Sequence, residues 1–295
     1  MRLRNKSFRR QNREKTLTIF LFLLIPVTML LTFAYYPLIK LIQMSFSNWV
    51  GYGKMDFIGF TNYIDVFNDE TIWASLLNTF AYFIAMLVQI SLGLFFAIIL
   101  ETKIRGANFF KSVIFMPNIM NGVAIAFMFS FLFNYKGPLN MILKAVGLNP
   151  IHWISANYGV NFTLASIGVW QFTGWCMVIF IAGLKSISKE LYEAAAVDGA
   201  NFFQIIKYII IPSLKPVIQL NLFFGINGAL QAYFQPLILT NGGPCGRSET
   251  FVFKTLDYAF EYGQYGKAAA MSIIMIGLVL TVMAFQHFIL REEKN

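Results

Sequence analysis

Charged residues are scarce in this sequence: only 13% of its 295 residues are Asp, Glu, Lys or Arg, whereas 57% are hydrophobic. A soluble domain of this length needs more charge to cover its surface. Six segments contain no charged residue, and each has the roughly 20 apolar residues that a helix needs to cross a bilayer. They are Leu17–Ile39, Leu76–Leu100, Val113–Phe133, Val160–Leu184, Val217–Ile238 and Ala268–Leu290. The sequence therefore predicts an all-α integral membrane protein with six transmembrane helices.

The six segments also lack the ionisable side chain that proton- or sodium-driven carriers usually keep inside the membrane. Whatever moves through this protein is therefore expected to be moved by energy delivered from elsewhere. The chain itself has no G-x-x-x-x-G-K-[ST] run for binding nucleotide phosphates. It also shows no Ser/His/Asp or Cys/His constellation, so we expect a transport subunit without catalytic residues, not an enzyme.

Cysteine and histidine are nearly absent, with two residues of each type. Cys176 lies in an apolar run and Cys245 in a polar loop, which predicts different depths and no disulfide. His152 and His287 have no Cys or His neighbour at metal-ligand spacing. We therefore expect no metal site and no cofactor in this chain.

Basic residues are in excess, giving a net charge of +9, and they gather at the ends of the apolar segments. With the N-terminus placed inside, 16 of the 23 Lys and Arg residues fall on the inner side, which indicates that both termini are cytoplasmic. The predicted organisation is a basic cytoplasmic tail (1–16), a six-span domain (17–290) and a short cytoplasmic tail (291–295). The basic N-terminal tail suits attraction to anionic membrane lipid better than binding of nucleic acid.

The inner loop from Lys185 to Pro212 is rich in helix signals. Ser188 is expected to cap a helix that starts at Lys189, and Lys189 can pair with Glu193 four residues later. Gly199 is expected to end this helix, as a C-terminal glycine does.

A second short helix is expected to follow in the same loop. Asn201 with Gln204 three residues later has the pattern of a capping box, and the helix is expected to end before Pro212. Ala194, Ala195 and Ala196 are expected to be exposed and to let another surface approach closely. On these signals alone the loop is either a docking element or an amphipathic linker.

The spacing within this loop resembles a known signature. Glu193-Ala194-Ala195 is followed by Asp198-Gly199 and then by Ile209, Ile211 and Pro212. This pattern resembles the EAA motif of ABC-importer permeases, in which Leu is usual where this chain has Ile211. The resemblance implies that Glu193, Ala194, Ala195, Asp198, Gly199 and Pro212 couple the chain to an ATPase.

Further segments resemble the maltose-type carbohydrate permeases, and in particular the first permease of the pair. They are Leu239–Pro244 (T-x-G-G-P), Gly59–Tyr63 (G-x-x-N-Y), Trp73 with Asn78-Thr79, and Gly266 with Ala268-Ala269. The implied fold is that of a binding-protein-dependent ABC permease of the type I importer class in the bacterial inner membrane. The implied partners are a second six-span permease, two ATPase subunits that bind ATP and Mg, an extracellular or periplasmic solute-binding protein, and a sugar.

The fifth apolar segment carries a polar and aromatic stripe that suggests a substrate path. Asn221, Phe224, Asn227, Gln231 and Gln235 step by three or four residues, as on one face of a helix. Amides can donate and accept hydrogen bonds with sugar hydroxyls. Tyr233 is a further candidate, and weaker ones are Asn118, Asn121, Trp170 and Gln171. The alternative is hydrogen bonding between helices, worth about 1 kcal/mol per contact.

Two other readings of the whole chain stay open at this point. One is an ABC permease for a different solute, such as glycerol phosphate or an oligopeptide. A phosphorylated solute would favour basic residues along the path, which the spans lack but partner subunits could supply. The other is a secondary carrier that works without an ATPase.

Overall fold

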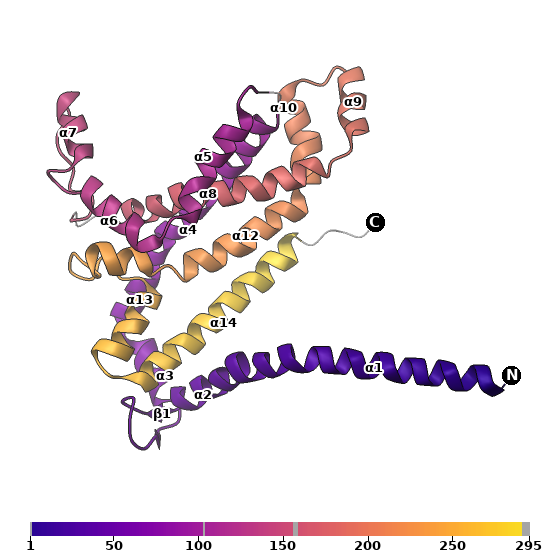
Figure 1. Ribbon diagram of the computed structural model, residues 1–295. Coiled ribbons are helices and arrows are strands. Elements are labelled where there is room, and N and C mark those ends of the chain that lie inside the picture. Colours follow the sequence, from indigo (N-terminus) through magenta and orange to yellow (C-terminus); the bar gives the residue numbers. More distant parts are fainter. Residues whose placement is uncertain (1, 103, 156–158, 291–295) are drawn as a thin grey trace. The chain divides into compact units, whose positions relative to one another are not determined.

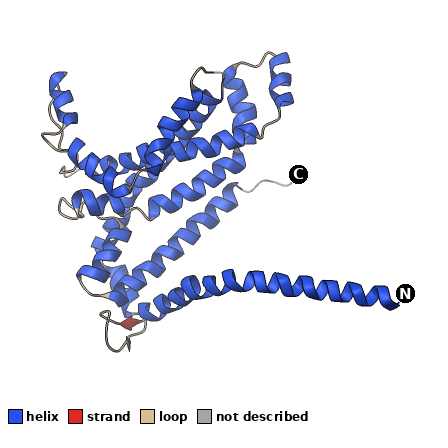
Figure 2. Cartoon of the chain, in the orientation of Figure 1, coloured by secondary structure: helices blue, strands red, loops and turns tan. Residues whose placement is uncertain are grey.

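The computed structural model describes residues 2–102, 104–155 and 159–290, and it is almost entirely helical (Figures 1 and 2). The predicted C-terminal tail 291–295, with Arg291 and Lys294 of the charge count, lies outside these residues, as does Lys103. The chain divides into two compact units. Unit 1 comprises Met1–Val66 and Tyr258–Ile273, and unit 2 comprises Phe67–Asp257 and Ile274–Asn295.

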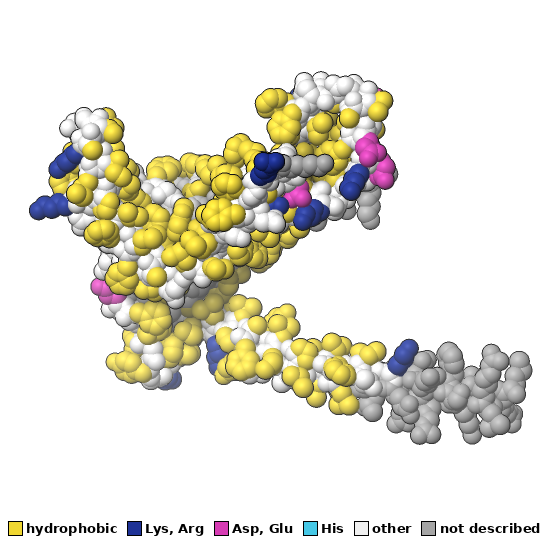
Figure 3. Space-filling model, turned by 45° about the horizontal axis from the view of Figure 1, so that its top comes forward, with side chains coloured by type: hydrophobic (Ala, Val, Ile, Leu, Met, Phe, Trp, Pro, Cys, Tyr) yellow, Lys and Arg dark blue, Asp and Glu magenta, His cyan; other side chains and the backbone are white. Residues whose placement is uncertain are grey.

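Four helical stretches of the described residues are long and apolar enough to cross a membrane: Thr18–Ser45, Glu70–Glu101, Val160–Lys185 and Tyr265–Gln286. Two bent helix pairs raise the number to six if each pair forms one span. Hydrophobic side chains cover most of the surface seen in the space-filling view, and charged side chains form only a few small groups (Figure 3). Such a surface suits lipid as the surrounding solvent.

Unit 1 begins with α1 (Arg2–Leu30), the π-helical turn η1 (Leu31–Tyr35) and α2 (Tyr36–Ser45). Residues 2–16 of the predicted tail are thus the first part of the same helix as the first span. Residues 18–40 of the apolar stretch are all exposed. The Tyr36 N–H bonds five residues back to the Leu31 carbonyl, just before Pro37. This wider turn leaves room for the pyrrolidine ring, which clashes with the preceding turn of a regular α-helix.

A small polar cluster holds the loop that follows α2. Strands β1 (Ser47–Asn48) and β2 (Asp56–Phe57) pair antiparallel and precede α3 (Thr61–Asn68). Buried Asn62 donates to the backbone carbonyls of Ser45 and Ser47, both at 3.0 Å. The Gly59–Tyr63 segment therefore has a structural task, which is to fasten this loop.

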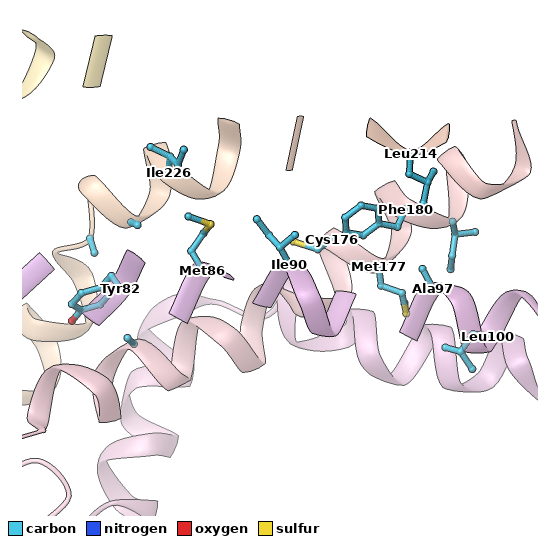
Figure 4. Packing of buried hydrophobic residues seen from close by; sticks show 14 of the residues in the cluster. Tyr82, Met86, Ile90, Ala97, Leu100, Cys176, Met177, Phe180, Leu214 and Ile226 are labelled. Atoms are coloured by element: carbon cyan, nitrogen blue, oxygen red, sulfur yellow. The ribbon is translucent and has the colours of Figure 1, made fainter. Parts of the chain in front are cut away.

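Unit 2 is built on two parallel helices, α4 (Glu70–Glu101) and α8 (Val160–Lys185). They pack closely at Gly93, where an added Cβ would lie 2.5 Å from Cys176 Cβ. Helix α12 (Lys215–Leu230) runs the opposite way, with Gly225 against Met86 of α4 and Val217 beside Gly183 near the end of α8. Buried side chains from all three helices form the core of the unit (Figure 4). They include Met86, Ile90, Met177, Phe180 and Ile226.

The two ends of unit 2 are formed by different helix termini and loops. At one end α4 and α8 finish, α12 begins, and Lys111 of α5 (Ala107–Ile119) pairs with Glu101 at 3.2 Å. At the other end α4 and α8 begin, and the loop 241–250 is fastened to both. Asn78 of α4 donates to the Glu249 carbonyl at 2.9 Å, and Asn161 of α8 to the Arg247 carbonyl at 2.8 Å.

The third apolar segment, Val113–Phe133, was predicted as one transmembrane helix, and in the structure it is divided between two helices. Helices α5 and α6 (Gly122–Leu132) meet at an angle of 98°. Pro117 lies in the last turn of α5, and Asn121 caps α6 by accepting from the Val123 N–H at 2.8 Å. A cap inside an apolar run starts a new helix because it satisfies the free N–H groups there. Helix α7 (Pro138–Ala145) follows α6.

The fifth segment, Val217–Ile238, is not continuous either. Helix α12 ends at Leu230, and the chain then forms the π-helical turn η3 (Pro236–Thr240). Pro236 has no N–H to bond the Ala232 carbonyl four residues earlier. Thr250, just before α13 (Phe251–Leu256), supplies the missing donor, with its hydroxyl 2.5 Å from that carbonyl. The turn η4 (Asp257–Glu261) and α14 (Tyr265–Leu290) complete the chain.

Candidate functional site: a coupling segment and a neutral cavity

The coupling segment, residues 185–214, joins the end of α8 to the start of α12. Its first helix, α9 (Lys189–Val197), ends as predicted at Gly199, which has a φ of +71°. The Ala200 N–H bonds the Ala195 carbonyl at 2.9 Å and the Gly199 N–H bonds the Ala196 carbonyl at 3.2 Å. This is a Schellman motif, which requires the left-handed conformation that glycine adopts without strain.

The start of α9 differs from the prediction. Ser188 occupies the N-cap position, but its side chain makes no capping hydrogen bond. Within the described part of the chain, no ion pair joins Lys189 to Glu193. Both side chains are exposed, where such a pair contributes little.

The second part of the segment starts with the predicted capping box. The Gln204 N–H donates to Asn201 Oδ1 at 3.0 Å, and the Asn201 N–H donates to Gln204 Oε1 at 2.7 Å. The helix was expected to end before Pro212, and this is wrong. Helix α10 (Phe202–Ile205) continues through the π-helical turn η2 (Ile206–Ile210) into α11 (Ile211–Ser213). The Ile211 N–H bonds back to the Ile206 carbonyl, so that the wider turn again precedes a proline.

Helix α9 presents a mixed acidic and apolar surface. Glu193, Ala194 and Asp198 are exposed, and Val197 is 88% exposed. Ala195, which was predicted to be exposed, is buried, with 9% of its surface exposed, and Tyr192 of the same helix packs against the core of unit 2. The surface available to another protein is therefore Glu193, Ala194, Val197 and Asp198, with exposed Phe202 and Phe203 following the turn.

A cavity of about 370 Å³ lies between α4, α8 and the end of α12. Five of the six predicted path residues line it: Asn221, Phe224, Gln231, Tyr233 and Gln235. The sixth, Asn227, is not part of the lining and instead accepts a hydrogen bond from Gln231 Nε2. The predicted single helical stripe is interrupted, because Gln231 and Gln235 lie beyond the end of α12 at Leu230. The chain leaves the helix after Leu230, and the residues that follow still line the same cavity.

The weaker candidates are used elsewhere. Asn121 caps α6, and Trp170 packs edge-on against Phe129 with ring centroids 5.3 Å apart. Gln171 is buried, and neither it nor Asn118 is part of the cavity lining.

The sequence prediction missed the part of the cavity wall that comes from α4 and α8. Tyr82 and Gln89 of α4 stand seven residues apart, on one face of that helix. Gln89 Nε2 donates to Cys176 Sγ at 3.2 Å, and Phe172 and Trp175 of α8 add aromatic surface. The spacing of Tyr82 and Gln89 was the available signal, but an isolated pair of this kind is common on any buried helix. None of the described residues that line the cavity is charged.

The comparisons with known proteins agree with this architecture. The chain belongs to the family described as "Binding-protein-dependent transport system inner membrane component", which it matches over residues 89–294. It is therefore a multi-pass membrane transport component, and not an enzyme. The predicted membership of the ABC-importer permeases is confirmed.

Two similar proteins are permeases of sugar transport systems. The multiple sugar-binding transport system permease protein MsmF of Streptococcus mutans is 31% identical, over 90% of this chain and 92% of its own. The trehalose/maltose transport system permease protein MalF of Thermococcus litoralis is 30% identical, over 89% and 90%. A crystal structure of a bacterial ABC transporter that imports the acidic polysaccharide alginate contains a chain of the same fold. That chain has a TM-score of 0.86 at 21% identity, over 97% of this chain and 99% of its own.

Proposed function

We propose that this chain is one permease subunit of an ATP-driven importer of carbohydrates. The observation that carries the proposal is the cavity of amide and aromatic side chains in the core of unit 2. Amides match sugar hydroxyls as both donors and acceptors, and a few polar groups on an aromatic wall are typical of ligand sites. The related sugar permeases support the same substrate class.

The other subunits of the importer follow from the family. A second six-span permease would complete the path, and two ATPase subunits would bind ATP and Mg. A solute-binding protein would deliver the sugar from outside. The proposed topology has both termini and the coupling segment in the cytoplasm, as the excess of Lys and Arg on that side favours. The loop 241–250 lies at the opposite end of unit 2 and would face outward.

We place the contact with an ATPase subunit on α9. Its exposed Glu193 and Asp198 provide polar contacts, and Val197 provides an apolar one. The Schellman turn at Gly199 fixes the angle at which α9 meets the rest of the segment, and Tyr192 packs α9 against the core of unit 2. Movement of the docked α9 would thus be passed to α8 and α12, whose facing residues line the cavity.

The test is to isolate the tagged chain gently from its own host membrane and identify the co-purifying proteins by mass spectrometry. We expect a second six-span permease and an ATPase, and ATP-dependent uptake of a sugar when the complex and its binding protein are reconstituted in liposomes. A chain that purifies alone and transports in liposomes without ATP would instead establish a secondary carrier.

A further inference from the structure

Two polar atoms in the cavity wall are buried without a hydrogen-bond partner, the Tyr82 hydroxyl oxygen and Asn221 Oδ1. The side chains are deeply buried, since Tyr82 is 7% exposed and Asn221 is 2% exposed. Asn221 Nδ2 donates to the Val217 carbonyl of its own helix at 3.0 Å, which leaves the oxygen free to accept. Buried polar groups in native proteins nearly always have partners, so a pair of unpaired atoms in one cavity points to a ligand.

A third polar group in the same wall is only weakly engaged. The Gln89 amide donates to the Cys176 thiol at 3.2 Å, and sulfur is a weak acceptor. A better acceptor entering the cavity can therefore take this donor. Between them, the three side chains offer an acceptor, a donor, and a hydroxyl that can do both.

We propose that Tyr82 and Asn221 bind hydroxyl groups of the solute in transit, and that they favour uncharged sugars over acidic ones. Sugar hydroxyls can donate to Asn221 Oδ1 and accept from the Tyr82 hydroxyl. A carboxylate or phosphate has only acceptors, so its oxygens would meet the Asn221 oxygen without a proton between them. No described residue of the lining carries a positive charge to offset this repulsion.

This inference rests on the proposed function, because it names the substrate class of the same cavity. It also distinguishes this chain from its structural neighbour, which imports the acidic polysaccharide alginate. The two share a fold, whereas the selection of cargo depends on the few side chains of the wall.

The experiment measures binding to the solubilised permease–ATPase complex without the binding protein, so that the cavity alone selects. Saturation-transfer NMR with neutral sugars, including trehalose and maltose, is compared with an alginate oligosaccharide as the acidic probe. The variants are Tyr82→Phe and Asn221→Leu, which remove one polar group each. The matched control is Thr79→Val, since Thr79 lies one turn from Tyr82 on α4, is buried, and bonds only its own helix at the Ser75 carbonyl.

We expect the complex to bind the neutral sugars and not the acidic one. Each cavity variant should weaken sugar binding about two- to tenfold, as expected for one neutral hydrogen bond, and the control should leave it unchanged. Thermal unfolding gives an independent readout: Tyr82→Phe removes a buried unpaired hydroxyl and should leave the Tm of the sugar-free complex unchanged or higher. A structural role for the hydroxyl would lower it.

Equal binding of the acidic probe, unchanged binding by both cavity variants, or a clear loss of Tm in Tyr82→Phe would each overturn the inference. Failure of the wild-type complex to bind any neutral sugar would do the same. These results leave the proposed function standing if the complete, reconstituted importer still takes up sugar with ATP. Loss of that uptake in the wild type would contradict the proposed function itself.

Discussion

Glycine residues set how closely the helices of unit 2 approach one another. Gly174 of α8 lies directly on α5, where an added Cβ would overlap the Ile114 carbonyl and lie 2.6 Å from Phe115 Cα. Gly93 and Gly225 make similarly close contacts between α4 and its neighbours. Lipid tails are as apolar as the helices themselves, so such close packing is a main source of helix association in membranes.

At the Gly174 position we predict that an alanine destabilises the protein. Gly174→Ala should lower the free energy of unfolding by about 1–3 kcal/mol, the usual cost of overpacking, because the obstacle is backbone that cannot turn away. Thermal unfolding of the purified protein in detergent measures this. The matched control is Gly277→Ala in α14, where an added Cβ meets nothing within 4 Å and helix propensity favours alanine. Equal Tm values for the two variants would show that α5 and α8 do not pack as described.

The shape of the coupling segment depends mainly on hydrogen bonds between residues close in sequence. An added Cβ at Gly199 would meet nothing within 4 Å, so the residue is required by its backbone conformation and not by space. Another residue can replace Gly199 only if it can adopt the left-handed backbone conformation.

Gly199→Pro is therefore expected to abolish ATP-dependent uptake while the complex still assembles. Proline cannot adopt the φ of +71° and lacks the N–H that bonds the Ala196 carbonyl, so the angle between α9 and α10 changes. Gly199→Asn is the control, since Asn visits the left-handed region most readily after glycine. Co-purification and sugar uptake in liposomes are measured together. Uptake at the normal rate in Gly199→Pro would show that this turn is not needed for coupling to the ATPase.

A side chain from a distant part of the chain, Thr250, stabilises the break between α12 and η3. Thr250 is fully buried, and its hydroxyl satisfies the Ala232 carbonyl that Pro236 cannot. Ala232 lines the cavity, so the same hydrogen bond fixes part of the cavity wall.

We predict that Thr250→Val costs about 1–3 kcal/mol of stability, because it leaves the buried Ala232 carbonyl unpaired and removes the side-chain cap of α13 at the Phe253 N–H. The comparison is Thr255→Val in α13, where the hydroxyl bonds the Phe251 carbonyl of its own helix and little is lost. Chemical or thermal unfolding of both variants in detergent tests this. Equal losses for the two would mean that the Thr250 bond is dispensable for the break.

At the scale of the whole molecule, the orientation in the membrane makes a direct prediction about the two cysteines. Cys245 is exposed in the loop 241–250, and Cys176 is buried within α8. In intact cells, a membrane-impermeant maleimide should label Cys245 and spare Cys176, because the proposed topology places that loop outside. Mass spectrometry of the purified protein locates the label, and Cys245→Ser should abolish it. Labelling of Cys245 only after the inner membrane is made permeable would invert the topology.

The fold class follows from the sequence because the bilayer leaves so few options. An apolar run of about 20 residues without charge must be helical in the membrane, since every backbone polar group needs a partner within the segment. The sequence also predicted two features of the coupling segment, the end of α9 at Gly199 and the capping box of Asn201 with Gln204. Both could be predicted because each depends only on residues three to six positions apart.

Tertiary structure decided what depends on partners from distant parts of the chain. Thr250 bonds the Ala232 carbonyl, 18 residues earlier in the chain, and so stabilises the helix break before Pro236. Ala195 is buried although the small-residue pattern predicted that it is exposed, because the pattern does not say which side of α9 faces the rest of the unit.

For the cavity, the sequence by itself determined which polar and aromatic side chains of the fifth segment can bind a solute. Five of the six predicted residues line the cavity. Only the tertiary structure added Tyr82 and Gln89 and removed Asn227. A helical period orders the residues of one helix around its own axis, but a cavity belongs to several helices at once. Which face of each helix meets the others is set by packing, here by the close contacts of Gly93 and Gly225 with their neighbours.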